Sequence, residues 1–97
     1  MIKKTLHLLR QSPFKQNDIS LCCHNVTIHD AIVLIDDGCY TINHQMFTEL
    51  CNTTQNIFII EDHVFARGLK MPNCIQAIHL NKFNELIFEY SNSVTWQ

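Results

Sequence analysis

Glycine is scarce in this chain, with only two in 97 residues, Gly38 and Gly68. The dinucleotide-binding fingerprint G-x-G-x-x-G and the phosphate-binding P-loop both need closely spaced glycines. Two widely separated glycines can build neither motif, and one follows Asp37 as in a turn while the other stands where a helix would end. The sequence therefore argues against nucleotide-dependent enzymes of the Rossmann and P-loop types.

Positive charge is also scarce, because lysine and arginine together number seven against nine acidic residues, for a net charge of -2. Proteins that bind DNA or RNA usually carry a basic stripe, since neutralising phosphates supplies much of the affinity. No such stripe is visible, so we predict no direct contact with nucleic acid.

Long apolar runs are absent, and no stretch approaches the ~18 apolar residues of a membrane span. The basic start at Lys3-Lys4 is typical of a signal peptide, but His7 and Arg10 interrupt the apolar run that follows. We therefore expect a soluble, cytoplasmic protein without membrane contact. Cysteines number five, an odd count, and without a secretory signal we interpret them as reduced thiols.

The composition that remains is that of a folded protein, with 46% hydrophobic and 16% charged residues. The length predicts a single domain over residues 1–97. A small domain leaves much of its surface exposed, and with few charges part of that surface must be apolar. This combination favours a protein partner.

Apolar runs alternate with helical patterns, which predicts a small three-layer βαβ domain of the α/β class with a mostly parallel sheet. Strands are expected at 5–9, 31–35, 57–60, 75–80 and around 94–96. Helices are expected from Asp18, over 43–51, from Asp62 and from Asn81. Asp62 and Asn81 are predicted as N-caps, and Gly68 as a left-handed helix end.

The most reactive-looking feature is Cys22-Cys23-His24, with His29 five residues further along. A thiolate is the nucleophile of sulfur transfer, and a persulfide on such a thiol can pass between proteins. The other interpretation is that Cys22 and Cys23 are small buried hydrophobic residues on the core face of the helix. The residues alone leave both interpretations open.

Metal and acid–base chemistry have weaker support. His24 and His29 have the H-x₄-H spacing of a zinc site, but no cysteine pair of matching spacing exists, so we predict no metal and no cofactor. Asp36-Asp37 ends a predicted parallel strand, where α/β folds place their sites, although Asp37-Gly38 is also typical of a turn. Arg67 is expected either to pair with a carboxylate or to face a partner.

Four segments resemble the TusB/DsrH family. Leu6–Phe14 is similar to its opening, in which a leucine-histidine strand runs into a Ser-Pro-aromatic turn, and Leu34–Gly38 to its second strand with the acidic-Asp-Gly ending. Glu61–Leu69 contains the family's Asp-x-x-x-Ala-Arg-Gly signature, the most specific of the set. Ser91–Trp96 resembles a tail that closes on a near-terminal tryptophan.

This resemblance implies a DsrE-like fold and a place in a heterohexamer with two copies each of three related subunits. In the TusBCD version, TusC-like and TusD-like subunits would be the partners, and the complex passes persulfide sulfur onward for 2-thiolation of the wobble uridine of certain tRNAs. There the sulfur-carrying cysteine belongs to the TusD subunit. The chain would then be a mainly structural, non-catalytic subunit.

The alternative is the sulfur-oxidation complex DsrEFH, whose DsrH subunit carries a cysteine on its first helix. Counted from Ser12-Pro13-Phe14, Cys22 stands at that position. The resemblance thus makes Cys22 the candidate site residue, as a persulfide carrier. We favour the tRNA branch because it is the more widespread, and the residues themselves leave the branch open.

Overall fold

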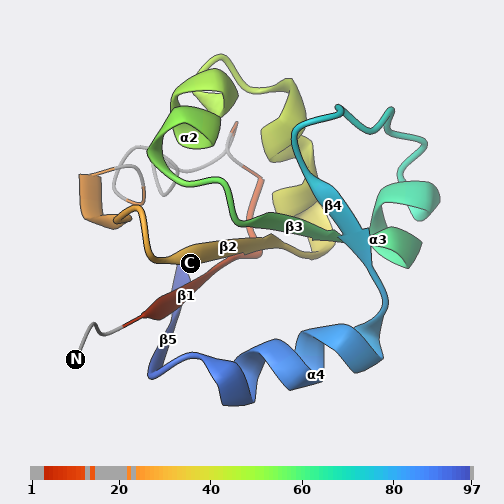
Figure 1. Cartoon of the computed structure of the whole chain (residues 1–97). Coiled ribbons are helices and arrows are strands. Elements are labelled where there is room, and N and C mark those ends of the chain that lie inside the picture. Colours follow the sequence, from red (N-terminus) through yellow and green to blue (C-terminus); the bar gives the residue numbers. More distant parts are fainter. Residues whose placement is uncertain (1–3, 13, 15–21, 23, 97) are drawn as a thin grey trace.

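Five parallel strands form one sheet in the order β4-β3-β2-β1-β5 (Figure 1). The structure is a computed structural model that describes residues 4–12, 14, 22 and 24–96. The strands are β1 (Thr5–Leu9), β2 (Ala31–Leu34), β3 (Ile57–Ile60), β4 (Gln76–Ile78) and β5 (Asn92–Trp96). All five predicted strands are therefore present, and the predicted α/β class with a parallel sheet is confirmed.

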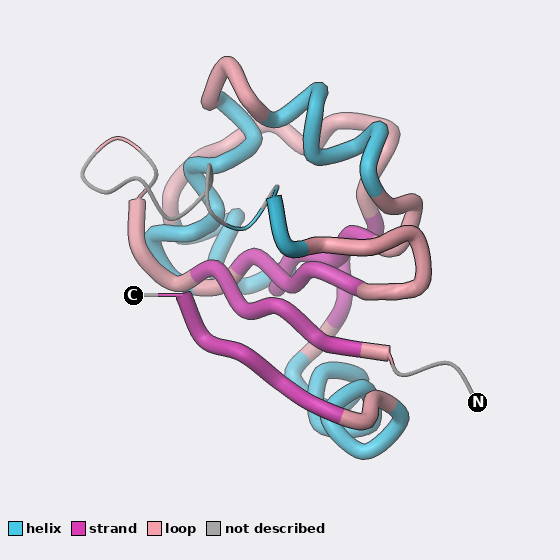
Figure 2. The backbone as a smooth tube through the Cα atoms, turned by 90° about the vertical axis from the view of Figure 1, so that its left-hand side faces the viewer, coloured by secondary structure: helices cyan, strands magenta, loops and turns pink. Residues whose placement is uncertain are grey.

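Helices cover both faces of the sheet, which gives three layers (Figures 1 and 2). On one side lie the 3-10 helix η1 (Asp36–Asn43) and the helices α2 (Phe47–Thr53) and α3 (Glu61–Ala66). On the other side lies α4 (Leu80–Glu89), which leads from β4 to β5. In the part of the chain that the structure describes, no helix has the length and apolar character that crossing a membrane requires.

Two hydrophobic cores result, because successive side chains of a strand point to opposite faces. In β2, Ile32 and Leu34 join the core under η1, α2 and α3, which also contains Val64. Ala31 and Val33 of the same strand join the core under α4. All four β2 residues are buried, as expected for a continuous apolar run in the middle of a parallel sheet.

The loop that follows β2 differs from the prediction. Asp36–Gly38 was expected as a simple turn, but these residues open η1, which runs to Asn43. The helix expected over 43–51 begins later, at Phe47, and ends at Thr53, since η1 occupies the first residues of that range. The helix expected from Asp18 lies mostly outside the described residues, which show its end at Cys22, His24 and Asn25.

Two predicted helix caps are wrong. α3 begins directly after β3 with Ile60 as its N-cap, so Asp62 lies within the first turn. α4 has His79 as its N-cap, and Asn81 lies within the helix, which also shortens the strand expected over 75–80. Neither helix has a side-chain hydrogen bond at its N-cap. The prediction for Gly68 is confirmed, because this residue follows α3 with a φ of 60°.

Candidate functional site

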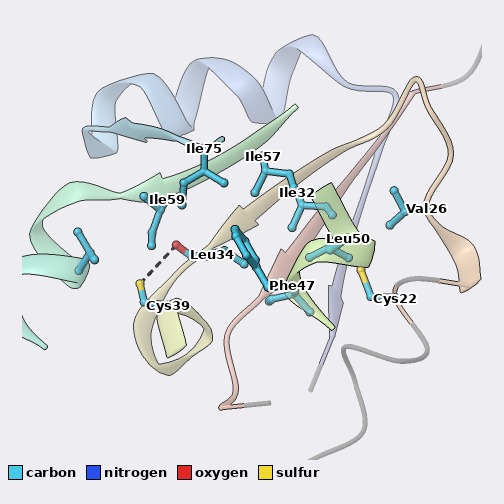
Figure 3. Close-up of a cluster of buried hydrophobic side chains, with 12 residues drawn as sticks. Cys22, Val26, Ile32, Leu34, Cys39, Phe47, Leu50, Ile57, Ile59 and Ile75 are labelled. Atoms are coloured by element: carbon cyan, nitrogen blue, oxygen red, sulfur yellow. Dashed lines mark hydrogen bonds between the residues drawn. The ribbon is translucent and has the colours of Figure 1, made fainter. Parts of the chain in front are cut away.

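Cys22, the candidate sulfur carrier, is fully buried, with 0% of its surface exposed. The N–H of Val26 donates to the Cys22 carbonyl oxygen at 2.9 Å, which is the helical i to i+4 pattern. The side chain belongs to the hydrophobic core that contains Phe47 and Leu50 of α2 (Figure 3). In this arrangement a donor persulfide cannot approach the sulfur atom.

The other members of the cysteine-histidine segment lie in different environments. Cys23 lies outside the described residues, and His24 and His29 are both exposed. Among the residues that the structure describes, no group of three or more histidine, cysteine, aspartate or glutamate side chains is arranged to hold a metal ion.

Polar side chains gather where β1, β2 and β3 end, at the carboxyl edge of the sheet. Arg10 follows β1, Asp36 follows β2 and His63 lies in α3 after β3. The backbone N–H of Asp36 donates to Nδ1 of His63 at 3.0 Å, and Nε of Arg10 lies 3.6 Å from Oδ2 of Asp36. Nδ1 of His63 also lies 3.7 Å from Oδ1 of Asp36. Because Nδ1 accepts the hydrogen bond from the backbone N–H of Asp36, this second contact is not an ion pair.

Arg67, the arginine of the family signature, pairs with Asp37. Its Nε and one terminal nitrogen both donate to Oδ1 of Asp37, at 3.2 and 3.1 Å. The other terminal nitrogen donates to the carbonyl oxygen of His63 at 3.1 Å. Of the two alternatives for Arg67, the structure shows the carboxylate pair, which ties α3 to η1.

Gly38 explains why the Asp-Gly ending fits this loop. A Cβ atom at Gly38 would overlap the carbonyl group of Leu9, so η1 can approach the end of β1 only with glycine here. The N–H of Gly38 lies 2.8 Å from the carbonyl oxygen of Ile35 and 3.0 Å from that of Arg10. Asp36, just before, has a φ of 49°, a left-handed conformation that aspartate tolerates better than most residues.

Both candidate carboxylates, Asp36 and Asp37, therefore pair with arginine side chains. Asp36 faces Arg10, and Asp37 faces Arg67. Each is about half exposed, and such surface pairs are individually worth little. The two aspartates therefore face different arginine side chains, and these contacts join η1 to α3 and to the end of β1.

Sequence reasoning missed a second polar cluster, inside the protein, around His7 and Asp30. Both residues are more than 95% buried, with Nε2 of His7 3.0 Å from Oδ2 of Asp30. The indole N–H of Trp96 donates to Nδ1 of His7 at 3.1 Å, and the two rings stack with centroids 6.1 Å apart. A histidine within an apolar strand was the available signal, because buried polar groups need partners.

The cluster fixes the tautomer of His7. The indole N–H can only donate, so Nδ1 of His7 must accept and the ring proton lies on Nε2, directed at Asp30. Asp30 also accepts the N–H groups of Thr5 and Thr27, at 3.0 and 3.1 Å. Burial raises the pKa of Asp30, but the hydrogen bonds from Thr5, His7 and Thr27 outweigh it, so the net pKa is lowered.

Cys39 is a second buried thiol of the same core, on η1. Its sulfur lies 3.7 Å from the carbonyl oxygen of Leu34, the contact dashed in Figure 3. Burial raises the pKa of this thiol to about 11, so at neutral pH it stays protonated. Cys39 therefore packs as a small hydrophobic residue.

Known proteins are similar to this chain in sequence and in fold. Protein TusB of Yersinia enterocolitica is 28% identical over 95 residues, which cover 94% of this chain and 99% of the relative. The solution NMR structure of protein Tm0979 from Thermotoga maritima superposes with a TM-score of 0.65 at 21% identity, covering 88% of this chain and 92% of the other. That likeness establishes the fold.

The residues of the Arg67–Asp37 pair and of the His7–Trp96 contact lie in the segments in which the sequence resembles the TusB/DsrH family. The family described as DsrH-like protein matches residues 11–93, which include strands β2, β3 and β4 and the helices η1, α2, α3 and α4. The chain therefore belongs to the DsrH-like protein family.

Proposed function

We propose that this chain is a mainly structural, non-catalytic subunit of a TusBCD-like sulfur-relay complex that supports 2-thiolation of the tRNA wobble uridine. Membership of the DsrH-like family supports a role in sulfur relay. Likeness to a TusB protein over nearly the whole of both chains favours the tRNA branch and a single domain over residues 1–97. The partners would be TusC-like and TusD-like subunits in a heterohexamer in the cytoplasm, with no direct contact to tRNA and no cofactor.

The observation that carries the structural role is the enclosure of Cys22. Sulfur transfer requires a thiolate to reach the donor's persulfide, and the Cys22 side chain has no exposed surface. Its neighbours Phe47 and Leu50 are core residues as well. The sulfur that the complex carries would therefore travel on a cysteine of another subunit.

Exposed apolar side chains support an interaction with other subunits. Phe65 of α3 is 75% exposed and Phe88 of α4 is 89% exposed, and Leu80 at the start of α4 is also exposed. Large apolar groups on a small soluble domain commonly mark interaction surfaces. A stable contact would bury roughly 800 Å² on each partner.

The second candidate is a DsrH-like subunit of a sulfur-oxidation complex in which Cys22 carries the persulfide. The position of Cys22 at the end of the first helix favours this alternative. It requires that the segment holding Cys22 leave the core when a donor docks, because the sulfur is otherwise enclosed.

Co-purification is the first experiment. The tagged chain, isolated from its host, should bring two related small subunits with it, and the mixture should sediment as a complex of higher mass. A chain that sediments as a lone monomer in the presence of these subunits would contradict the subunit proposal. The isolated chain is expected to show no turnover with a sulfur donor or tRNA.

The Cys22→Ser variant separates the two candidates. We expect the assembled complex to thiolate tRNA at the wild-type rate with this variant, and mass spectrometry to find no additional sulfur on Cys22 after incubation with a loaded donor. Cys39→Ser is the matched control, since Cys39 is another fully buried thiol of the same core. Loss of the relay with Cys22→Ser alone, with normal assembly, would favour the carrier.

A further inference from the structure

Two cysteines outside the core lie against each other. Sγ of Cys51 and Sγ of Cys74 are 3.1 Å apart, although the residues are 23 positions apart in the sequence. Cys51 is in the middle of α2, and Cys74 is in the turn before β4. Cys74 is exposed and Cys51 is partly exposed. The pair is thus open to reagents in solution, whereas Cys22 and Cys39 are enclosed.

The core holds the two sulfur atoms in place. Leu50, next to Cys51, and Ile75, next to Cys74, are both buried in the core that η1, α2 and α3 cover. Cys51 itself packs against that core. The contact therefore joins two elements whose neighbouring residues are already fixed. A disulfide bond is about 2.05 Å long, so the two sulfur atoms would have to approach each other by about 1 Å to form one.

We propose that Cys51 and Cys74 form a redox-active thiol pair, which closes to a disulfide by exchange with a low-molecular-mass disulfide and reopens with a thiol. This site is independent of the proposed sulfur-relay role. The two cysteines come from the α2 side and the β4 side of the same core, so closure would link these two elements covalently.

The reaction proceeds in two exchanges. The Cys74 thiolate attacks one sulfur of the external disulfide, a mixed disulfide forms on Cys74, and the first external thiolate leaves. Cys51 then attacks the Cys74 sulfur, the second external thiolate leaves, and the protons of the two cysteines pass to the two departing thiolates. The two protein thiols are oxidised, and the external disulfide is reduced to two thiols.

The order of attack follows from the environments of the two sulfur atoms. Burial is the main reason that the pKa of Cys51 is raised, to about 12, and the neighbouring Cys74 adds to the effect. The Cys51 thiol is therefore a poor first nucleophile, and the exposed Cys74 meets the external disulfide first. Once the mixed disulfide has formed, Cys51 lies in contact with the sulfur that it must attack.

The test is a titration of the purified full chain with oxidised and reduced glutathione, followed by alkylation of the remaining thiols, intact mass measurement and peptide mapping. We expect a form that is two hydrogen atoms lighter and contains a Cys51–Cys74 crosslink, which reduced glutathione reverses. Closing a loop of this length should also raise the melting temperature by roughly 10 °C.

Variants identify each step. Cys51→Ser should stop at a stable glutathione adduct on Cys74, while Cys74→Ser should show neither the crosslink nor a rapid adduct. Cys39→Ser, which keeps both thiols of the pair, should close as the wild type does, and its circular dichroism spectrum checks the fold. Adducts on Cys74 without a crosslink in the wild-type chain, or a crosslink to a different cysteine, would overturn the proposal.

Discussion

Trp96 donates its indole N–H to Nδ1 of His7 across 89 positions of sequence, at a distance of 3.1 Å. The bond joins β5 to β1, two neighbouring parallel strands. In their register Trp96 lies opposite Leu9, and Val94 lies opposite His7. Strand β5 is mostly exposed and pairs with β1 through its backbone, and the tryptophan adds a side-chain contact to this pairing. Trp96 thus has a structural role in this chain.

The variant Trp96→Phe tests this role. Phenylalanine retains an aromatic ring for stacking but leaves the buried Nδ1 of His7 without its donor, which should lower the free energy of unfolding by about 2 kcal/mol. Urea unfolding followed by far-ultraviolet circular dichroism measures the change. The exposed neighbour variant Thr95→Ser should stay within about 0.5 kcal/mol of the wild type. Equal stability of the two variants would contradict the role.

The lowered pKa of Asp30 predicts that the free energy of unfolding depends on pH. Its pKa is lowered in the folded protein from an ordinary value of 3.8, because hydrogen bonds outweigh the effect of burial. The carboxylate therefore contributes its full stabilisation above pH 3.8, and this contribution is lost as the pH falls through the lower folded-state value.

Asp30→Asn should remove that contribution. An amide turns a donor toward one of the N–H groups that Asp30 now accepts, so we expect a loss of about 2 to 3 kcal/mol at neutral pH. Urea unfolding between pH 7 and about pH 2 should show the wild type and the variant converging below the ordinary carboxyl pKa. A constant difference across this range would count against the assigned pKa shift.

The two glycines should respond differently to alanine. Gly38→Ala places a methyl group on the carbonyl of Leu9, and the backbone there cannot yield without moving β1 or η1, so a loss of about 3 kcal/mol or more is expected. The Cβ atom added by Gly68→Ala has no other atom within 4 Å. This variant should lose only about 1 kcal/mol of stability, because alanine is less stable than glycine in the left-handed conformation. Thermal unfolding of both variants under one buffer measures the difference. Similar losses would mean that η1 lies farther from β1.

Assembly should depend on the exposed phenylalanine of α4. Phe88 is 89% exposed, so Phe88→Ser should leave the stability of the isolated chain unchanged and weaken binding to the partner subunits about tenfold or more. Titration of labelled chain with purified partners measures the affinity. Asn84→Ser, at another exposed position of the same helix, is the control. Unchanged affinity with Phe88→Ser would place the interface on a different surface.

The sheet was predictable from the sequence because its strands have a recognisable local pattern of apolar residues. Ile57–Ile60 and the run from Ala31 are continuous apolar segments, which is the pattern of strands buried on both faces. Helix starts were less predictable. Asp62 and Asn81 are good capping residues, but α3 and α4 begin before them because the chain turns into the helix directly after the strand.

The sequence by itself determined the fold class, the strands and the segments that identify the family, since these depend on local apolar patterns and short motifs. Only the tertiary structure decided what the polar and sulfur-containing residues contact. The partners of His7 lie 23 and 89 positions away, and the Cys51–Cys74 contact spans 23. Such contacts arise when a parallel sheet brings distant strands side by side, and no local pattern encodes that proximity. For the same reason the burial of Cys22 could be learned only from the packing of α2 above it.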